Sequence, residues 1–260
     1  MSRVRRVVSL VPSLTKTMFD LGLGDRLIGV TRFCVDPVDG VASIAKVGGT
    51  KNPRLSDVVS LKPDLVLVNS EENRRSDIGW LEERFEVFET MPKSILDVTE
   101  LLRALGERLD CHDEAESFVL QIQAEMTRIE VEGIGRSRIQ VFAPIWKGPW
   151  MSFNRDTYLH HLLATVGADN ICADYEERYP VISEDVMESL RPDLVLLPSE
   201  PFEFGLDHQS ELLRSSLFPG CQVLLVDGRD YTWHGSMTGA ALGRVHDFLI
   251  GHRGPADEGD

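Results

Sequence analysis

The densest group of chemically active side chains lies at residues 227–239, "DGRDYTWHGSMTG", directly after the apolar run "QVLLV". Asp230, Trp233 and His234 offer a carboxylate, an indole and an imidazole within five residues. An imidazole there can donate a hydrogen bond, ligate a metal or act as a general base. A lone histidine without partners at ligand spacing is weak evidence for a metal, and we expect none. A histidine satisfied within its loop is the structural alternative.

A second group is aromatic. The Gly-Pro loop "IWKGPWMSF", residues 145–153, carries Trp146 and Trp150. Exposed indoles supply large, rigid apolar area for a flat or bulky ligand, whereas two buried indoles would simply cover the sheet. Further along, "ERYPVISEDV" (177–186) places Tyr179 before a proline and a helix start, where ordinary helix capping is the alternative.

The remaining candidates share a position just after a predicted strand. Open α/β sheets bind ligands at the carboxyl ends of their strands, so we expect these side chains to reach a ligand. Solvated acids are the alternative for the two glutamates. The residues are Arg32, Phe33, Thr50, Glu71, Glu200 and Phe202.

Several common catalytic motifs do not occur in the chain. The sequence has no G-x-x-x-x-G-K-[ST], no G-x-G-x-x-G after a strand, no H-E-x-x-H and no G-x-S-x-G. These absences favour a binding protein. An enzyme that uses Asp230 or a strand-end glutamate as base and His234 as acid remains the alternative.

The sequence contains an internal repeat in the segments expected to hold these residues. "SLKPDLVLVNSE" at 60–71 returns as "SLRPDLVLLPSE" at 189–200. In each copy a helix ends, proline prevents its continuation, and a strand that is apolar on both faces begins. The same order of strand, loop and helix precedes each copy, which predicts an α/β sheet in each half.

The middle of the chain is helical by its pattern. No proline occurs from Lys93 to Ala143, and apolar residues recur at helical spacing on both sides of the polar "DCHDE" at 110–114. The second helix runs to about Glu132 and would span roughly 30 Å. We therefore expect an N-terminal lobe at 1–96, connecting helices at 97–136 and a C-terminal lobe at 137–260, with a ligand cleft between the lobes.

Composition excludes several classes of function. A net charge of −15 disfavours binding to nucleic acid and to anionic membrane surfaces. No apolar stretch approaches the roughly 20 residues that cross a bilayer, so we expect no membrane span. Four scattered cysteines without a C-x-x-C pattern favour reduced thiols in a cytosol. The role of Cys34, beside Arg32 and Phe33, is left open.

Taken together, the segments resemble a known family. The family is that of the helical-backbone receptors, which are the substrate-binding proteins of ABC importers for cobalamin, haem and ferric siderophores. The resemblance covers nearly the whole chain. It is carried by the proline-free central helices and by the segments "RVVSLVPSLTKTMFDLGLGDRLIGVT", "VGGTKNPRLSDVVSLKPDLVLV", "PWMSF", "ERYPVISEDV", "RPDLVLLPSEPFEF" and "DYTWHGSMT".

The resemblance implies a fold and a function. The fold is two Rossmann-like α/β lobes joined by a long rigid backbone helix, and the function is non-enzymatic ligand binding in the inter-lobe cleft. The ligand would be cobalamin, haem or a ferric siderophore, with no prosthetic group. Cobalamin binders of this family touch the corrinoid from loops that correspond to Phe33, Trp150, Tyr179, Asp230 and His234 here.

The resemblance also implies a partner, the permease of an ABC importer. Members dock on importer arginines through one acid at a helix start in each lobe. Asp185 matches that position, and Asp57 is displaced from it by one residue because Ser56 takes the expected place. The chain looks most like a branch of the family that lacks a signal peptide. Positions 36 and 237 are commonly His and Arg in that branch but are Asp36 and Met237 here, which weakens metal or anion binding there.

The sequence leaves two possibilities open for the cellular compartment and two for the mode of action. The sequence starts directly at its first strand without a signal peptide, which predicts a cytoplasmic protein as the sequence stands. A start site placed too far downstream would restore an extracytoplasmic or periplasmic location. A cytosolic carrier that delivers its ligand to another protein is the alternative to transport.

Overall fold

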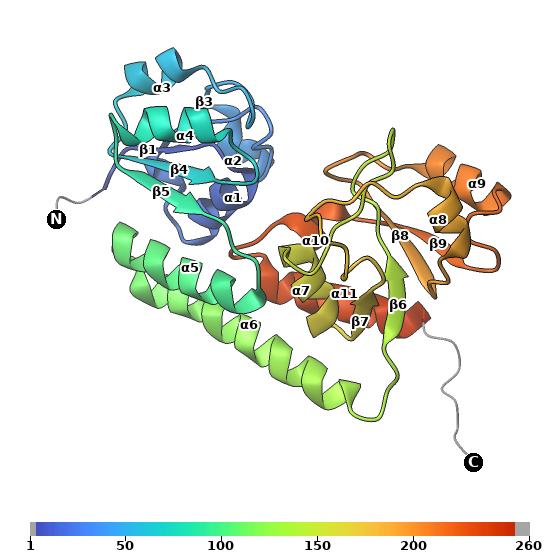
Figure 1. Ribbon diagram of the computed structural model, residues 1–260. Coiled ribbons are helices and arrows are strands. Elements are labelled where there is room, and N and C mark those ends of the chain that lie inside the picture. Colours follow the sequence, from blue (N-terminus) through green and yellow to red (C-terminus); the bar gives the residue numbers. More distant parts are fainter. Residues whose placement is uncertain (1–3, 253–260) are drawn as a thin grey trace. The chain divides into compact units, whose positions relative to one another are not determined.

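The computed structural model describes residues 4–252 and divides into two compact units (Figure 1). The first unit comprises the chain up to Pro92, Leu96–Leu120 and the short segment His234–Met237. The second comprises Lys93–Ile95, Gln121–Trp233 and the chain from Thr238 onward. The predicted bounds of the lobes and of the connecting helices stay a prediction, and residues 253–260 lie outside the described part.

The first unit is built on a five-stranded parallel sheet with strand order β3-β2-β1-β4-β5. Its strands are β1 (Val7–Ser9), β2 (Leu27–Val30), β3 (Ala45–Lys46), β4 (Leu65–Asn69) and β5 (Val87–Thr90). Its short helices are α1 (Pro12–Asp20), η1 (Gly24–Arg26), α2 (Val38–Ala42), α3 (Leu55–Leu61) and α4 (Arg75–Glu82).

The two central strands of this sheet explain its core. Every residue of β1 and β4 is buried, as expected for parallel strands covered on both faces. One face packs against α1 and against Leu101 and Leu105 of the helix that follows. The other face packs against Val58 of α3 and Ile78 of α4. The chain therefore holds this sheet between two layers of helices.

Two long helices follow the first sheet. These are α5 (Ile95–Leu109) and α6 (His112–Gly133). Asp110, with φ of 58°, interrupts the helical path between them, where the polar stretch predicted a break. Arg103 of α5 and Glu116 of α6 form an ion pair at 2.8 Å. Helix α6 continues without a break through the residue at which the two units divide.

The second unit repeats the plan with a four-stranded parallel sheet of order β7-β6-β8-β9. Its strands are β6 (Ile139–Phe142), β7 (Ala168–Asn170), β8 (Leu194–Pro198) and β9 (Gln222–Val226). Its helices are α7 (Tyr158–Thr165), α8 (Glu184–Ser189), α9 (Leu206–Arg214), α10 (Gly228–Thr232) and α11 (Thr238–His252).

The repeated segment, residues 60–71 and 189–200, folds as predicted in both units. In the first copy, α3 ends at Leu61, Lys62 adopts a left-handed conformation, and the buried strand β4 begins after Pro63. In the second copy, α8 ends at Ser189 and the fully buried strand β8 begins after Pro192. The prediction of two parallel α/β sheets is confirmed.

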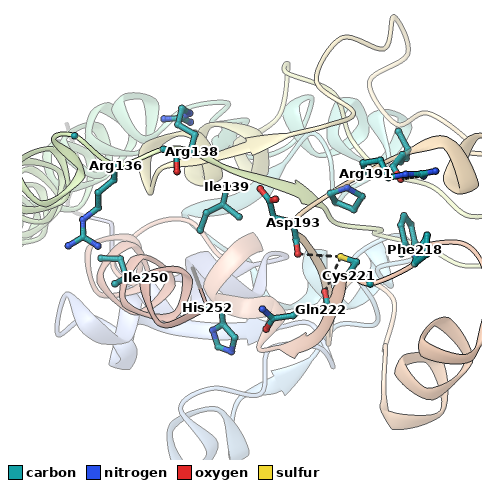
Figure 2. A pocket seen from close by; sticks show the side chains of 16 residues that line it. Arg136, Arg138, Ile139, Arg191, Asp193, Phe218, Cys221, Gln222, Ile250 and His252 are labelled. Carbon is teal, nitrogen blue, oxygen red and sulfur yellow. Dashed lines mark hydrogen bonds between the residues drawn. The ribbon is translucent and has the colours of Figure 1, made fainter. Parts of the chain in front are cut away.

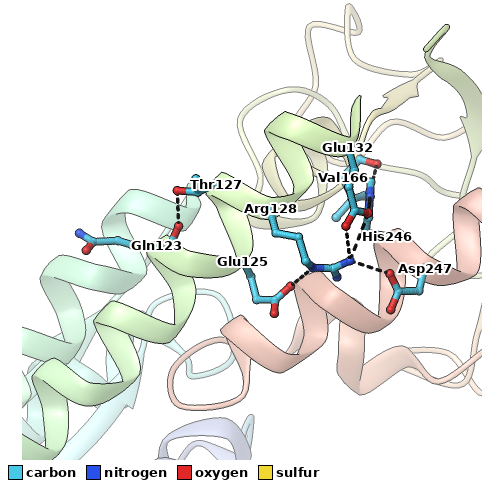
Figure 3. Close-up of polar contacts among 8 residues, drawn as sticks. All are labelled: Gln123, Glu125, Thr127, Arg128, Glu132, Val166, His246 and Asp247. Carbon is cyan, nitrogen blue, oxygen red and sulfur yellow. Dashed lines mark hydrogen bonds and ion pairs between the residues drawn. The ribbon is translucent and has the colours of Figure 1, made fainter. Parts of the chain in front are cut away.

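Helix α11 is fixed to α6 by a polar cluster on the second unit (Figure 3). Arg128 of α6 pairs with Glu125 and Glu132 on its own helix and with Asp247 of α11. His246 of α11 is buried, with its ring nitrogens 3.2 Å from a Glu132 carboxylate oxygen and 3.3 Å from the Val166 carbonyl oxygen.

A short segment late in the sequence completes the first unit. We call residues 234–237 the strap. The Ser236 hydroxyl donates to the Asp20 carboxylate at 2.6 Å, and Thr17 Oγ1 accepts from the Ser236 amide at 3.2 Å. Gly235 has φ of +113°, and a Cβ added there would lie 2.3 Å from Thr17 Oγ1. Only glycine fits this close approach without a local shift.

Among the helices of residues 4–252, none combines the length and apolar character that a bilayer crossing requires.

Candidate functional site

The loops at the carboxyl ends of β2 and β3 bring Arg32 and Phe33 to the surface of the first unit. The Arg32 amide donates to the Gly48 carbonyl at 2.8 Å, which ties the two loops together. The Phe33 side chain is about half exposed, with the Arg32 guanidinium carbon 4.8 Å from its ring centroid. A Cβ added at Gly49 would lie 3.2 Å from the Phe33 ring, so the ring rests on bare backbone. The result is an exposed aromatic side chain with a cation beside it.

Thr50 and Glu71 lie on neighbouring loops that are also tied to each other. The Asn73 amide donates to the Thr50 carbonyl at 2.9 Å, and the Lys51 ammonium donates to the Glu71 carbonyl oxygen. Asn73 is buried and also donates to the Leu10 carbonyl at 3.3 Å. These bonds use backbone oxygens, so Asn73 and Lys51 hold the two loops together through the main chain.

Cys34 is a structural thiol at the base of these loops. It is buried, with Thr15 Oγ1 and Thr31 Oγ1 at 3.1 and 3.2 Å from its sulfur. Burial raises the pKa of this thiol, although the two hydroxyls oppose the shift. A protonated, enclosed thiol is a poor nucleophile and a poor metal ligand.

His234, at the start of the strap, is buried as well. Desolvation lowers the pKa of its imidazole to about 4. The ring is therefore neutral at physiological pH, and a neutral imidazole of such low basicity cannot serve as a general acid there. Its role as a ligand contact stays a prediction.

In the second unit, the loops after β6 and β8 assemble an aromatic group. We define the aromatic group as Trp146, Trp150, Phe202, Phe204 and His208. The Trp146 ring meets the Phe202 ring edge to face, with 5.3 Å between centroids. Trp146 is 45% exposed, so one face of its indole is open to solvent. These two side chains, both predicted from the sequence, are brought together by adjacent parallel strands.

Trp150 has a different position in the same group. It is 7% exposed and stacks on Phe204, with ring planes 4° apart and centroids 6.0 Å apart. Its backbone pairs with the next segment, since the Ile182 amide donates to the Trp150 carbonyl at 2.9 Å. Trp150 is thus part of the hydrophobic core against which Phe202 packs. Its contact with a ligand stays a prediction.

The charged candidates after β8 and β9 are held by neighbouring side chains. The Thr232 hydroxyl donates to the Glu200 carboxylate at 2.7 Å. Arg244 of α11 makes two bonds to the Asp230 carboxylate, at 2.5 and 2.9 Å. Trp233, which follows Thr232 in the sequence, is buried. Asp230 is therefore fixed by an ion pair within its own unit.

Tyr179 is an exposed aromatic side chain next to a charged network. The Arg178 guanidinium carbon lies 5.7 Å from its ring centroid, and Arg178 donates to Asp156 at 2.5 Å. Lys93 also donates to Asp156, at 2.7 Å. The hydrogen bond from Lys93 lowers the pKa of the Asp156 carboxyl, and Arg178 adds to this effect. Tyr179 therefore lies next to an ion-paired group formed by Arg178, Asp156 and Lys93.

The two predicted docking acids differ in their surroundings. Both lie in the first turn of a helix, Asp57 in α3 and Asp185 in α8. Asp57 Oδ2 accepts from Arg54 Nε at 2.5 Å, whereas Asp185 is exposed, and the described residues give it no ion pair. Docking at either acid stays a prediction.

A metal site requires several donors close together. Within residues 4–252, no group of three or more His, Cys, Asp and Glu side chains is arranged to hold a metal ion.

Sequence reasoning did not single out Phe204, His208 and Arg244. The Gly205 amide donates to His208 Nδ1 at 3.1 Å, which places the ring against Phe202 and Phe204. The spacing Phe-x-Phe at 202–204 was a usable signal, because alternate residues of an extended segment face the same side. No local signal pairs Asp230 with Arg244.

Known proteins share this architecture. A family model described as periplasmic binding protein matches residues 7–218. The vitamin B12-binding protein of Pectobacterium carotovorum is 24% identical over 200 residues, which cover 76% of this chain and 72% of that protein.

Two solved structures match nearly the full length. A periplasmic haem binding protein from Pseudomonas aeruginosa gives a TM-score of 0.82 at 21% identity, covering 97% of this chain and 95% of that one. The periplasmic vitamin B12 binding protein of Vibrio cholerae gives 0.81 at 19% identity, covering 96% and 98%. At these identities the likeness establishes the fold.

Proposed function

Since the chain belongs to the periplasmic binding protein family, we propose that it is a non-enzymatic receptor for a bulky, partly aromatic ligand. The ligand we propose is a corrinoid or a related tetrapyrrole, with an iron chelate as the next class. Relatives named for vitamin B12 and structures named for haem support this choice.

The observation that carries the proposal is the pairing of Trp146 with Phe202. A half-exposed indole braced edge to face by a second ring is a preformed stacking surface. Because Phe202 packs against the core that holds Trp150 and Phe204, the ring that braces Trp146 loses little side-chain freedom on binding. A flat macrocycle is the ligand shape that gains most from such a surface.

The remaining exposed candidates would add contacts of two kinds. Phe33 and Tyr179 each present an aromatic ring with an arginine beside it. An arginine next to a ring suits a ligand that carries both conjugated and acidic groups. Thr50 and Glu71 would contribute polar contacts. Trp150, Trp233 and His234 would act mainly by holding their loops.

Two observations favour binding over catalysis. The Asp230 carboxylate is engaged by Arg244, and His234 is neutral at physiological pH because its pKa lies at about 4. A general acid needs an available proton near the working pH. The pair on which the enzymatic alternative rests is therefore poorly suited to acid–base chemistry.

We further propose that the partner is the permease of an ABC importer, contacted through Asp185 and Asp57. This places the protein outside the cytoplasm, because importers receive ligand there, while a cytosolic carrier is the alternative. Fractionation of cells that express the gene with its native upstream region separates the two. Recovery of all the protein with the cytosolic fraction would favour the carrier.

The ligand experiment is a set of titrations of the purified protein with cyanocobalamin, haemin and a ferric siderophore. Binding is followed by tryptophan fluorescence, corrected for ligand absorbance, and by the ligand's own spectrum. We expect saturable binding of one ligand, weakened about fivefold by Trp146→Ala and by Phe202→Ala, since stacking contributes on the order of 1 kcal/mol per ring.

Trp80→Phe is the matched control. Trp80 lies in α4 of the first unit, under the Arg84 guanidinium, and belongs to none of the candidate loops. Its replacement should lower the fluorescence signal without changing the affinity. Three flat titrations, or equal affinities in wild type and Trp146→Ala, would contradict the proposal.

A further inference from the structure

The second unit has a pocket at the edge of its sheet opposite the candidate loops (Figure 2). Its walls are the residues that precede β6, β8 and β9, together with the last turn of α11. The candidate loops follow the same three strands. Since the strands are parallel, the pocket and these loops lie at opposite ends of them, roughly 15 Å apart along a five-residue strand. No part of the proposed function uses this pocket.

The pocket has the size of a small-molecule site. Its volume is about 990 Å³, at the upper end of the usual range for ligand pockets. Apolar side chains form part of its wall, namely Ile139, Leu190, Phe218 and Ile250. Ile139 and Phe218 are buried, and Phe218 is fixed by a ring contact to Phe142 at 5.1 Å. A ligand would meet a firm apolar surface.

The charged residues of the wall are mostly cations. Arg138 is neutralised by Asp169, 2.5 Å away. Arg191 donates to the carbonyl oxygens of Glu188 and Leu190, which carry no formal charge. For Arg136, the described part of the chain supplies no ion pair.

Among the residues that the structure describes, Asp193 is the one acidic residue of the pocket wall. Its carboxylate accepts a hydrogen bond from the backbone amide of Gln140 at 2.7 Å. In Figure 2, Arg136 and Arg191 lie toward opposite sides of the view, with Asp193 and Cys221 between them. A local excess of positive charge on a chain of net charge −15 attracts an anion to this place.

We propose that this pocket binds a small amphipathic organic anion, with its carboxylate or phosphate on Arg136 or Arg191 and its apolar body against Phe218 and Ile250. Guanidinium groups are suited to both anions because their donors match two oxygens at once. Inorganic anions lack the apolar body, and uncharged aromatics lack the head group. Each should bind more weakly than a molecule that has both.

Cys221 provides a reporter inside the pocket. It lies in the pocket wall and is part-exposed, whereas Cys34, Cys111 and Cys172 are buried. Burial raises the pKa of the Cys221 thiol to about 11, so its modification is slow enough to follow. The rate of Cys221 modification by a methanethiosulfonate reagent, read by mass spectrometry of the full-length protein, measures access to the pocket.

The probe is 1-naphthyl phosphate, compared with inorganic phosphate and with 1-naphthol. We expect saturable protection of Cys221 by the probe and at least tenfold weaker protection by either fragment. Arg136→Gln or Arg191→Gln should raise the half-saturating probe concentration about tenfold, and the double variant should raise it further. Raising the ionic strength should also weaken protection, because the guanidinium groups of Arg136 and Arg191 are solvent-accessible.

Arg214→Gln is the matched control. Arg214 is an exposed arginine of the same unit whose guanidinium donates to the Ser210 carbonyl oxygen, much as Arg191 donates to the Glu188 carbonyl oxygen. It should leave protection unchanged. Circular dichroism and urea midpoints verify that each variant is folded.

Several outcomes would overturn the proposal. These are absence of protection at millimolar probe, equal protection in the double variant, and equal protection by 1-naphthol or by inorganic phosphate alone. None of these outcomes bears on the titrations with cobalamin, haemin or siderophore, since those ligands are proposed for the other end of the sheet.

Discussion

Arg128 and Asp247, 119 residues apart in the sequence, form an ion pair at 3.0 Å that joins α6 to α11 within the second unit. Arg128 also pairs with Glu125 and Glu132, so one cation stands among three carboxylates (Figure 3). The hydrogen bonds from Arg128 to Glu125 and Asp247 raise the pKa of its guanidinium. Removing this side chain would leave three acids facing one another.

We therefore expect Arg128→Met to lower the stability of the second unit by about 1 kcal/mol at low salt, and by less at 1 M salt, because the charges are partly exposed. Arg103→Met, which breaks a single exposed pair between α5 and α6, should have a smaller effect. Urea midpoints at two salt concentrations measure both. Equal losses at both salt concentrations would show that packing, not charge, is responsible.

The two tryptophans of the loop after β6 should respond in opposite ways to truncation. Trp150→Ala removes a buried ring that stacks on Phe204, so we expect a loss of about 3 kcal/mol or more in the free energy of unfolding. Trp146→Ala removes a half-exposed ring and should change stability by less than about 1 kcal/mol. Urea unfolding of both variants tests the contrast, which fails if Trp146→Ala is the more destabilised.

His234 should make stability depend on pH in a defined direction. Its pKa is about 4 in the folded protein, against an ordinary value near 6.5, because burial penalises the charged ring. Between pH 6.5 and 4 the unfolded chain binds a proton that the folded chain does not. The stability that is present above pH 6.5 is therefore lost as pH falls to 4, by up to about 3 kcal/mol.

Replacing this residue should flatten the pH profile. His234→Gln removes the titrating group, so the fall in urea midpoint from pH 7 to 4.5 should be smaller than in wild type. His112→Gln, at an exposed histidine at the start of α6, should leave the profile unchanged. Parallel profiles for wild type and His234→Gln would refute the assignment.

Gly235→Ala tests the strap. Its φ of +113° and a Cβ position 2.3 Å from Thr17 Oγ1 combine backbone strain with a direct clash. Thr17 is branched at Cβ and bonded to the Ser13 carbonyl, so it cannot easily turn away. Gly22→Ala, at φ of +72° with open space around it, should cost only about 1 kcal/mol. A thermal melt should show a larger fall in melting temperature for Gly235→Ala than for Gly22→Ala. Equal falls would mean that the strap shifts to accommodate the added methyl group.

The two predicted docking acids, Asp57 and Asp185, should contribute unequally to binding of the importer. Asp57 is already paired with Arg54, whereas the exposed Asp185 has no ion pair among the described residues, so importer arginines would gain more from Asp185. We expect Asp185→Lys to reduce ligand uptake in cells that carry the native importer more than Asp57→Lys does. Ligand affinity of the purified variants should stay unchanged. If affinity falls in step with uptake, these acids do not act in docking.

Much of the fold could be predicted because its signals are local. Helix, proline and apolar strand occur in order within a dozen residues, and the pattern that predicted a helix ending near Glu132 matches α6 ending at Gly133. The family and the two parallel sheets are confirmed. The strap could not be predicted, because residues 234–237 meet Thr17 and Asp20 more than 200 positions away.

The candidate site was predictable in outline only. Strand order placed Trp146 and Phe202 on neighbouring loops, since the carboxyl ends of parallel strands share one edge. The exposure of each tryptophan was not predictable, because the loop lacks a helical or strand period. Trp150 is buried because its ring packs in the core against Phe204, a contact that only the folded chain defines. The docking roles and the inter-lobe cleft stay predictions.

The strap also determines when the first unit can be finished during synthesis. Thr17 and Asp20 leave the ribosome more than 200 residues before their hydrogen-bond partner Ser236. The nascent first unit must therefore wait for synthesis of all four strands of the second sheet before these two side chains form their native contact. A chain that stopped before residue 234 would lack the hydrogen bonds that Ser236 makes to Thr17 and Asp20, so the order of synthesis leaves the first unit incomplete until the second has been made.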